Sequence, residues 1–147
     1  MRKRFVIHEH HATRLHFDLR LEIEGVLKSW AVPKGVSMNS ADKRLAVAVP
    51  DHSLSYINFE GTLAEGTYGA GRVAIWDKGE FEAENAEAEL RKGKLIFTFD
   101  GAKLKGEFTL VKFWNHEKNW LIIKSKDEYA DADWKLETVL EVKKGKK

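Results

Sequence analysis

The sequence contains no cysteine, only two prolines and no long hydrophobic run. Without cysteine, the chain can form neither a disulfide bond nor a metal site built on thiolates. No charge-free apolar run approaches the roughly 18 residues that a membrane-spanning helix needs. The basic N-terminus leads into an apolar run of only three residues, Phe5 to Ile7, which is not the pattern of a signal peptide. We therefore expect a cytoplasmic protein without membrane contact.

The sequence also lacks a large excess of positive or negative charge. It contains 25 Lys and Arg residues and 23 Asp and Glu residues, which give a net charge of +2. Any affinity for polyanions must then come from a local patch. The 147 residues are 43% hydrophobic and include five Trp and eight Phe, enough for one core but not for two ordinary domains. We expect a monomer with a single domain over residues 1–147 and frayed basic ends at 1–4 and 142–147.

Short strands separated by turns are predicted along most of the chain. From Leu15 to Ile23, apolar and polar residues alternate, which is typical of a half-buried strand. A turn at Glu24-Gly25 joins this strand to the next. Further elements are predicted at 26–32, 45–49, 72–76, 94–99, 104–113 and 119–124 as strands, with a hairpin signal at Asp100-Gly101, and at 85–93 as a helix capped by Asn85. This spacing predicts a mainly β fold, a compact β-barrel or sandwich with minor helices.

Four of the six histidines lie between residues 8 and 16, and an aspartate and an arginine follow at alternate positions. His16 and Asp18 lie on one face of the predicted strand, about 6.6 Å apart, so they can lean toward one metal ion. His10 can reach back toward the same face from a loop or strand end. The alternative is a solvated face with weak ion pairs, Asp18 with Arg20 or Arg20 with Glu22.

Aromatic and glycine-rich segments have simpler interpretations. Trp30, Trp76 and Trp120 lie in predicted strands and are expected in the core, whereas Trp114 could stack on a base or cap the barrel. The Gly-rich segment 65–71 lacks the Gly-Lys-Ser/Thr of a phosphate-binding loop and leads into a β-rich run. We expect it to form a tight turn between strands, where glycine permits positive φ.

Longer motifs follow one another along most of the chain. They are His10-x5-His16-x-Asp18-x-Arg20-Leu21-Glu22, LKSWAVPKG at 27–35, KRLAV at 43–47, Asp51-His52 with Tyr56, FEG at 59–61 and EGTYGAG at 65–71. Together they resemble the 3'-phosphoesterase domain of bacterial DNA ligase D and its stand-alone archaeal relatives, over nearly the whole chain to about Tyr129. The resemblance implies a compact β-barrel that uses a divalent metal, usually manganese, to heal 3' ends in DNA break repair. Such enzymes remove a 3'-terminal ribonucleoside, and many then hydrolyse the remaining 3'-phosphate.

The resemblance also implies roles for individual residues. His10, His16 and Asp18 would bind one Mn²⁺ and leave positions open for water and a phosphate oxygen. Arg20, two residues beyond Asp18, would grip phosphate oxygens with its planar guanidinium. His52, which by itself would be interpreted as a surface or hydrogen-bonded histidine, would bind phosphate as an imidazolium or act as a general acid.

Three further residues have weaker implied roles. Lys34 and Arg44 would be secondary phosphate contacts and Tyr56 a hydroxyl donor, although the same residue types also suit ordinary loops and strand edges. The implied substrates are DNA or RNA/DNA primer-template 3' ends. The implied partners are a separate DNA ligase, a polymerase and a Ku-type end-binding protein of nonhomologous end joining.

The sequence departs from the family pattern at His8 and His11, where Gln and Asp are common, and at Pro50, where Glu is frequent. By themselves, both histidines are expected at the surface. Because all three positions border the implied pocket, they could tune metal affinity or the balance of the two reactions. We expect the ribonucleoside-removing step and leave the removal of the 3'-phosphate open.

Two other classes of function stay open. A non-catalytic nucleic-acid-binding barrel would use the same basic and aromatic residues without turnover. A non-haem iron oxygenase is less favoured, because the chain is short for that fold. It is considered because His16 and Asp18 with His52 or His116 formally make a triad of two histidines and one carboxylate.

Overall fold

A computed structural model describes residues 2–64 and 70–140 of the chain. Within these ranges it contains nine strands, one α-helix, α1 (Ala86–Arg91), and one 3-10 helix, η1 (Leu54–Asn58). The strands are β1 (Arg2–His11), β2 (Leu15–Ile23), β3 (Val26–Val32), β4 (Lys43–His52), β5 (Gly61–Leu63), β6 (Gly71–Glu82), β7 (Lys94–Gly101), β8 (Lys105–Lys112) and β9 (Asn119–Lys124). The expected mainly β fold with minor helices is confirmed.

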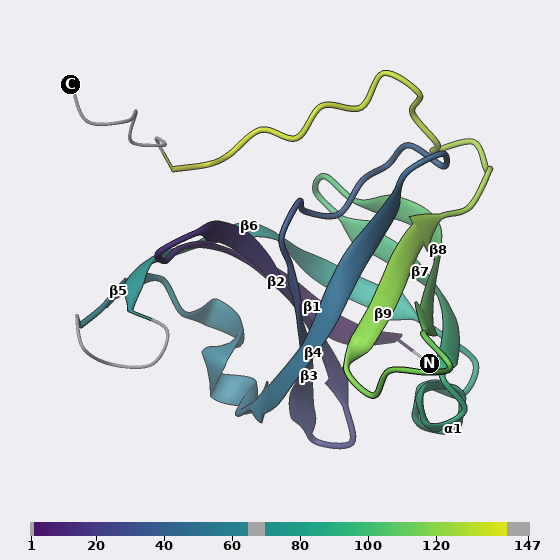
Figure 1. Cartoon of the computed structure of the whole chain (residues 1–147), viewed down its shortest axis with the longest axis horizontal. Coiled ribbons are helices and arrows are strands. Elements are labelled where there is room, and N and C mark those ends of the chain that lie inside the picture. The colour runs from purple at the N-terminus through teal and green to yellow at the C-terminus, as the bar shows by residue number, and fades with distance from the viewer. Residues whose placement is uncertain (1, 65–69, 141–147) are drawn as a thin grey trace.

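The sheet closes into an antiparallel barrel. Neighbouring strands follow the order β1-β2-β3-β4-β9-β8-β7-β6, and β6 pairs in turn with β1, so eight strands form a closed ring. β5 is a short additional strand that pairs with the first residues of β6. Figure 1 shows β5 and η1 on the same side of the barrel. Because closure pairs the two outermost strands, the barrel has few exposed sheet edges.

The two faces of β2 meet two different environments. Phe17, Leu19 and Leu21 belong to the barrel core. The most prominent members of that core are six phenylalanines, each at most 1% exposed: Phe5, Phe17, Phe81, Phe97, Phe99 and Phe108. On the opposite face, Asp18 and Arg20 are 6% and 4% exposed. The central part of β2 is therefore buried on both faces, whereas alternation alone predicted a half-buried strand.

A second apolar cluster accounts for the burial of this outer face. Val6 of β1 and Leu27 of β3 pack with Ile57 of η1, separately from the main core. Ser53 caps η1, because its hydroxyl accepts a hydrogen bond from the backbone N–H of Ser55. The segment from η1 to β5 thus covers the wall formed by β1, β2 and β3, and polar side chains of that wall are enclosed beneath it.

The first residues of the chain extend β1 instead of fraying. Arg2 Nε lies 2.8 Å from Glu80 Oε1, and its Nη2 lies 2.9 Å from Asp100 Oδ2. Arg4 pairs with Glu22 of β2 at 3.1 Å. The expectation of a frayed end is therefore wrong for residues 2–4, which pair with β6 across the closing seam of the barrel. Met1 and residues 142–147 lie outside the described ranges.

The expected helix and hairpin both form. Asn85 Oδ1 accepts a hydrogen bond from Ala88 N at 3.3 Å, which confirms Asn85 as the N-cap of α1. β7 and β8 form the hairpin, but Asp100 and Gly101 are the last residues of β7, and the turn occupies the next three residues. The buried carboxylate of Asp77 holds that turn, because it accepts hydrogen bonds from all three backbone N–H groups at 2.8–3.1 Å.

After β9 the chain crosses one end of the barrel as a C-terminal strap, residues 129–140 (Figure 1, yellow). The indole N–H of Trp76 donates to the carbonyl of Glu137 at 2.7 Å. Glu9 of β1 is fully buried, and its carboxylate accepts hydrogen bonds from the N–H groups of Val139 and the following residue at 2.7 and 2.8 Å. The strap is therefore bonded to β1, the strand that carries His8, His10 and His11.

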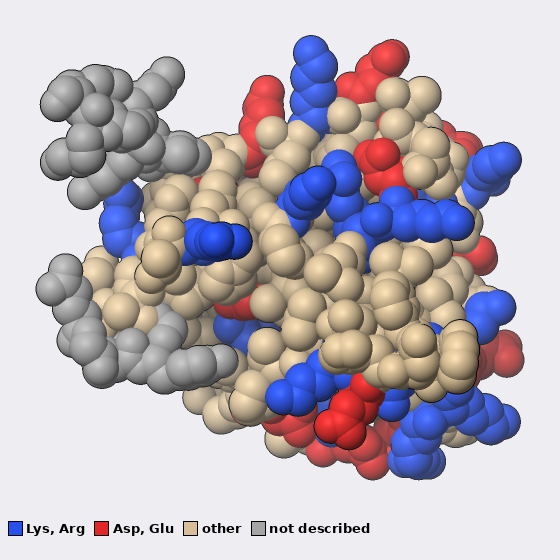
Figure 2. Space-filling model, in the orientation of Figure 1, with Lys and Arg blue, Asp and Glu red and all other residues tan. Residues whose placement is uncertain are grey.

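The surface carries charges of both signs. On the face shown in Figure 2, Lys and Arg side chains are interspersed with Asp and Glu side chains. Neither helix in the described ranges has the length and apolar character needed to cross a membrane.

Candidate metal and phosphate site

The hairpin of β1 and β2 brings the predicted metal ligands together. Its register places His10 directly opposite His16, and His8 directly opposite Asp18. Because directly opposed residues share a face, the imidazoles and the carboxylate converge on the outer side of the wall. The carboxylate of Asp18 lies 3.4 Å from His10 Nδ1 and 3.2 Å from His16 Nε2. His10 thus belongs to β1 itself and faces His16 across the hairpin.

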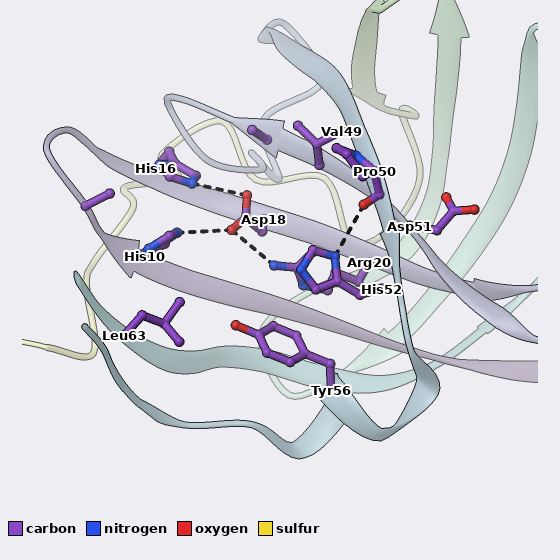
Figure 3. Close-up of a pocket in the computed structure, with 12 residues that line it drawn as sticks. His10, His16, Asp18, Arg20, Val49, Pro50, Asp51, His52, Tyr56 and Leu63 are labelled. Carbon is purple, nitrogen blue, oxygen red and sulfur yellow. Dashed lines mark hydrogen bonds and ion pairs between the residues drawn. The ribbon is translucent and has the colours of Figure 1, made fainter. Parts of the chain in front are cut away.

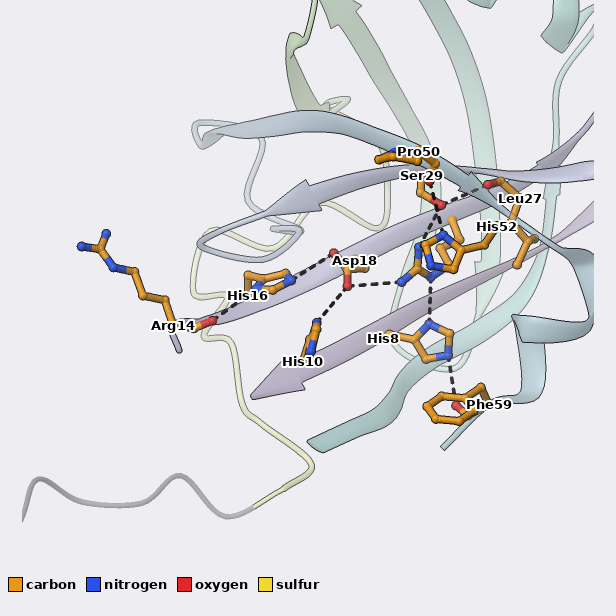
Figure 4. Close-up of polar contacts among 11 residues, drawn as sticks. His8, His10, Arg14, His16, Asp18, Leu27, Ser29, Pro50, His52 and Phe59 are labelled. Atoms are coloured by element: carbon orange, nitrogen blue, oxygen red, sulfur yellow. Dashed lines mark hydrogen bonds and ion pairs between the residues drawn. The ribbon is translucent and has the colours of Figure 1, made fainter. Parts of the chain in front are cut away.

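The surroundings keep Asp18 ionised. Burial alone would raise the pKa of Asp18, but hydrogen bonds with His10 and His16 and the charge of Arg20 hold it well below its usual range. Burial would also lower the pKa of His16, but its bond to Asp18 outweighs burial and the pKa is raised. His16 Nδ1 lies 3.2 Å from the Arg14 carbonyl, so Nδ1–H donates there and Nε2 faces Asp18 (Figure 4).

A divalent metal ion fits this donor set. One ligand atom from each of His10, His16 and Asp18 lies within 4.8 Å of the others. Two imidazoles and a carboxylate are a ligand set that transition metals accept with positions left open. Across residues 2–64 and 70–140, neither His52 nor His116 joins this group. The particular ligand set of the oxygenase hypothesis is therefore not formed.

Arg20 lies beside the triad with four of its five N–H groups engaged. Nε donates to His8 Nδ1 at 3.0 Å, and Nη2 donates to Asp18 Oδ2 at 3.3 Å. Nη1 lies 2.9 Å from Ser29 Oγ and 3.1 Å from His52 Nδ1. A guanidinium has five N–H groups, so the described residues leave one, on Nη2, for a ligand. Bidentate binding of a phosphate by Arg20 would require one of its four hydrogen bonds to break.

A bulge in β4 brings His52 to the same face. Between Ser29 and Leu27 of β3 the register slips, so that Pro50 and Asp51 of β4 oppose a single β3 residue. The extra residue reverses the alternation of side chains and turns His52 toward the pocket. Proline suits this position because a bulge leaves one residue without a ladder hydrogen bond. The departure from the family pattern at Pro50 thus lies where the strand is irregular.

His52 is favoured as a neutral imidazole. Burial and the charge of Arg20 lower its pKa. Because Arg20 can only donate, His52 Nδ1 accepts its N–H, and the ring proton is on Nε2. The Pro50 carbonyl, 3.3 Å from Nδ1, could accept a hydrogen bond only if Nδ1 carried a proton, and the N–H of Arg20 at the same nitrogen disfavours that. The free site therefore favours a neutral donor at His52 over the imidazolium that the family resemblance implied.

These groups line one pocket of about 550 Å³ (Figure 3). Tyr56 lies beneath Arg20, with its ring centroid 5.1 Å from the guanidinium carbon. Burial raises the pKa of Tyr56, so its hydroxyl keeps its proton and can donate. The apolar part of the wall consists of Ala12, Ala31, Val49, Pro50 and Leu63. The pocket therefore joins a polar wall suited to phosphate with an apolar wall suited to a sugar or base.

Two of the expected contacts lie elsewhere. Lys34 is exposed beyond the end of β3, and Arg44 of β4 bonds to Asp42 at 3.3 Å. Neither belongs to the pocket wall. Their contact with a longer nucleic-acid substrate stays a prediction.

The structure corrects the interpretation of His8 and His11. His8 is fully buried, and its ring nitrogens contact Arg20 and the Phe59 carbonyl. His11 is half-buried and bonds to Glu9 at 2.7 Å. The surface expectation is wrong because η1 and the segment after it cover the outer face of β1, while on its other face the strap bonds to Glu9, the partner of His11.

Ser29 is a site residue that the sequence reasoning missed. Its hydroxyl accepts from Arg20 and donates to the Leu27 carbonyl at 3.0 Å. The sequence does contain a signal that could have identified Ser29. A two-residue turn at Glu24-Gly25 pairs Ile23 with Val26, and counting back along both strands from that pair places Arg20 opposite Ser29.

The remaining sequence expectations have mixed outcomes. Trp30, Trp76 and Trp120 are buried in the core, as predicted. Trp114 is 93% exposed, so it does not cap the barrel, and base stacking stays a prediction. The turn expected at 65–71 falls mostly on residues 65–69, outside the described ranges. Gly71 has a φ of +126°, and a Cβ there would lie 2.2 Å from the His11 carbonyl oxygen, so glycine is required at that position.

Comparison with known proteins agrees with this geometry. Residues 8–112 match the model of a family described as the DNA Ligase D 3'-phosphoesterase domain. The chain belongs to this family. Residues 8–112 hold the metal triad, Arg20 and His52, while the C-terminal strap lies beyond them.

Multifunctional non-homologous end joining proteins LigD are similar to this chain. The protein of Pseudomonas aeruginosa is 46% identical over 130 residues, which cover 86% of this chain and 16% of that protein. The protein of Mycolicibacterium smegmatis is 45% identical over 132 residues, covering 85% of this chain and 17% of that protein. The chain thus corresponds to about a sixth of the length of these relatives.

Proposed function

We propose that this chain is a manganese-dependent phosphoesterase that removes a 3'-terminal ribonucleoside from DNA or RNA/DNA primer-template ends. The observation that carries the proposal is the placement of a His10, His16 and Asp18 triad beside Arg20 and His52 in one pocket. Membership of the DNA ligase D 3'-phosphoesterase family supports the reaction class. The P. aeruginosa and M. smegmatis relatives support a role in non-homologous end joining.

The metal would supply Lewis-acid activation of the scissile phosphate. The protein's own groups then bind and orient that phosphate. Arg20 offers the remaining Nη2–H and a buried positive charge, which stabilise negative charge on the phosphate oxygens. His52 donates its Nε2–H as a neutral group, and Tyr56 adds a hydroxyl donor. Apolar residues of the wall, such as Val49 and Leu63, face the terminal nucleoside.

The test uses a 5'-labelled primer-template with one 3'-terminal ribonucleotide, with manganese or with EDTA. We expect manganese-dependent shortening by one nucleoside to a 3'-phosphate end. Asp18→Asn and His16→Ala should abolish the product. Asp133→Asn and His116→Ala are matched controls, because both side chains are exposed and lie outside the pocket.

Two outcomes would contradict the proposal. Shortening that persists in Asp18→Asn would show that the triad does not serve the reaction. Binding of the primer-template without any shortening would instead establish the non-catalytic nucleic-acid-binding barrel. The same gel resolves a 3'-phosphate from a 3'-hydroxyl product and so reports whether the phosphate is also removed.

We further propose that the chain acts as a monomer, in one domain, together with a separate DNA ligase, a polymerase and a Ku-type end-binding protein. The LigD relatives support this choice of partners, since they are multifunctional non-homologous end joining proteins of which this chain matches one part. Stimulation of ligation of ribonucleotide-ended breaks in a reconstituted mixture would test it. A mixture that ligates equally well with the Asp18→Asn variant would count against it.

A further inference from the structure

His8 lies next to the metal triad without belonging to it. Its side chain is fully buried and stands directly opposite Asp18 in the hairpin. Nδ1 accepts the Nε–H of Arg20 at 3.0 Å, and Nε2 lies 3.1 Å from the Phe59 carbonyl oxygen (Figure 4). Arg20 can only donate and a carbonyl can only accept, so the ring is a neutral tautomer with its proton on Nε2. Neither ring nitrogen is left to bind a metal ion.

We propose that His8 is a positioning residue that sets the orientation of the Arg20 guanidinium toward the substrate phosphate. This inference rests on the proposed function of the pocket. Ser29, His52 and Asp18 hold the two terminal nitrogens of Arg20, and His8 alone among the described residues holds Nε. Bonds at Nε and at both terminal nitrogens fix the plane of the guanidinium as well as its place.

The bond to Phe59 gives His8 a second function. Phe59 follows η1 in the segment that covers the pocket, and its ring stacks on Tyr56 at a centroid distance of 4.7 Å. The His8 ring packs against the same Tyr56 ring in a T-shaped arrangement, at a centroid distance of 5.2 Å. His8 therefore connects Arg20, on the barrel wall, with the cover on the other side of the pocket. Loss of this connection would leave a buried N–H of Arg20 and a buried carbonyl without partners.

The chemistry of the position predicts which replacements it tolerates. Glutamine also carries one acceptor and one donor on a single planar group, so it can accept from Arg20 and donate to the Phe59 carbonyl. Leucine has a similar bulk and offers neither. Asparagine can place its oxygen near the position of Nδ1, but it is too short to reach Phe59.

The first experiment compares His8→Gln with His8→Leu in the manganese-dependent assay. We expect His8→Leu to lower kcat about 10- to 100-fold with little change in KM, because a misplaced phosphate-binding group weakens the transition state most. His8→Gln should recover most of the loss. His116→Gln and His116→Leu are the matched pair at an exposed histidine and should behave alike. In an Arg20→Lys background, which has no Nε–H to hold, the two His8 variants should become equal.

The second experiment needs no activity. The Arg20 Nε–H should give a ¹H–¹⁵N signal protected from solvent exchange in the wild-type protein and in His8→Gln, and should lose that protection in His8→Leu. If the wild-type protein does not process 3' ends, the proposed function fails and this signal still decides whether His8 holds Arg20.

Several results would overturn the inference. Equal kcat in His8→Leu and the wild type would do so, as would a His8→Gln variant as slow as His8→Leu. An unprotected Arg20 signal in the wild type would also refute it. If His8→Leu fails to fold, the His8→Asn variant is used in its place. Because asparagine keeps an acceptor near Arg20 Nε, the Arg20 signal should stay protected in this variant, and loss of that protection would refute the contact.

Discussion

Acid should destabilise the metal-free protein through His8 in a way that can be measured. Burial and the charge of Arg20 lower the pKa of His8 from 6.5 to about 4. Between these values the unfolded chain binds a proton that the folded protein does not, so the free energy of unfolding falls as the pH falls from 6.5 to 4. The difference, 6.5 minus about 4, at about 1.36 kcal/mol per unit, corresponds to about 3 kcal/mol.

Urea denaturation in EDTA, followed by Trp fluorescence between pH 4 and 7.5, checks this value. The comparison is with His8→Gln, which keeps the hydrogen bonds and cannot titrate. His16, whose pKa is raised, and His52, whose pKa is lowered, titrate in both proteins and cancel in the difference. The wild type should lose about 3 kcal/mol more than the variant over this range. Parallel curves for the two proteins would refute the burial of a neutral His8.

Three further predictions concern other parts of the chain. Gly101→Ala should lower the free energy of unfolding by about 1–3 kcal/mol in urea denaturation, because its Cβ would lie 2.6 Å from Asp77 Oδ2; full stability would contradict the close packing. Glu9→Ala should remove protection of the Val139 amide from hydrogen exchange, since that amide loses its acceptor. Unchanged protection would show that the strap keeps its place without the bond to Glu9. Trp114→Ala should weaken primer-template binding by about 1–3 kcal/mol in an anisotropy titration if the exposed ring stacks on a base, and unchanged affinity would exclude this contact.

The sequence predicted the strands because its hydrophobic pattern and turn residues agree with one another. Alternation along β2 placed His16, Asp18 and Arg20 on one face, and the structure keeps them there. The same alternation could not show that this face is covered, because the cover is η1, which packs from a segment more than thirty positions later in the chain. Burial of the polar face is thus a tertiary property, and the surface expectation for His8 failed for that reason.

Two features of the structure depend on strand pairings that cannot be predicted from the local sequence pattern. The bulge that turns His52 toward the pocket depends on the register between β3 and β4, which the residues Pro50 and Asp51 permit but do not require. The closing contact of β1 with β6 joins segments about seventy positions apart, so the ordered state of Arg2 and Arg4 depends on partners far along the chain. The periodicity of the sequence predicts which side chains lie on the same face of a strand. The tertiary pairing of strands decides which residues lie opposite them.

The buried charge of Arg20 links the stability of the fold to the chemistry of the pocket. A guanidinium at 4% exposure is tolerated only because Asp18 compensates its charge and His8, Ser29 and His52 accept its hydrogen bonds. Asp18 is shared between Arg20 and the two imidazoles of the triad. An ion that draws the Asp18 carboxylate toward the triad would weaken its bond to Arg20 Nη2 and free that nitrogen for phosphate. Any metal ion held by the triad would therefore share this carboxylate with Arg20.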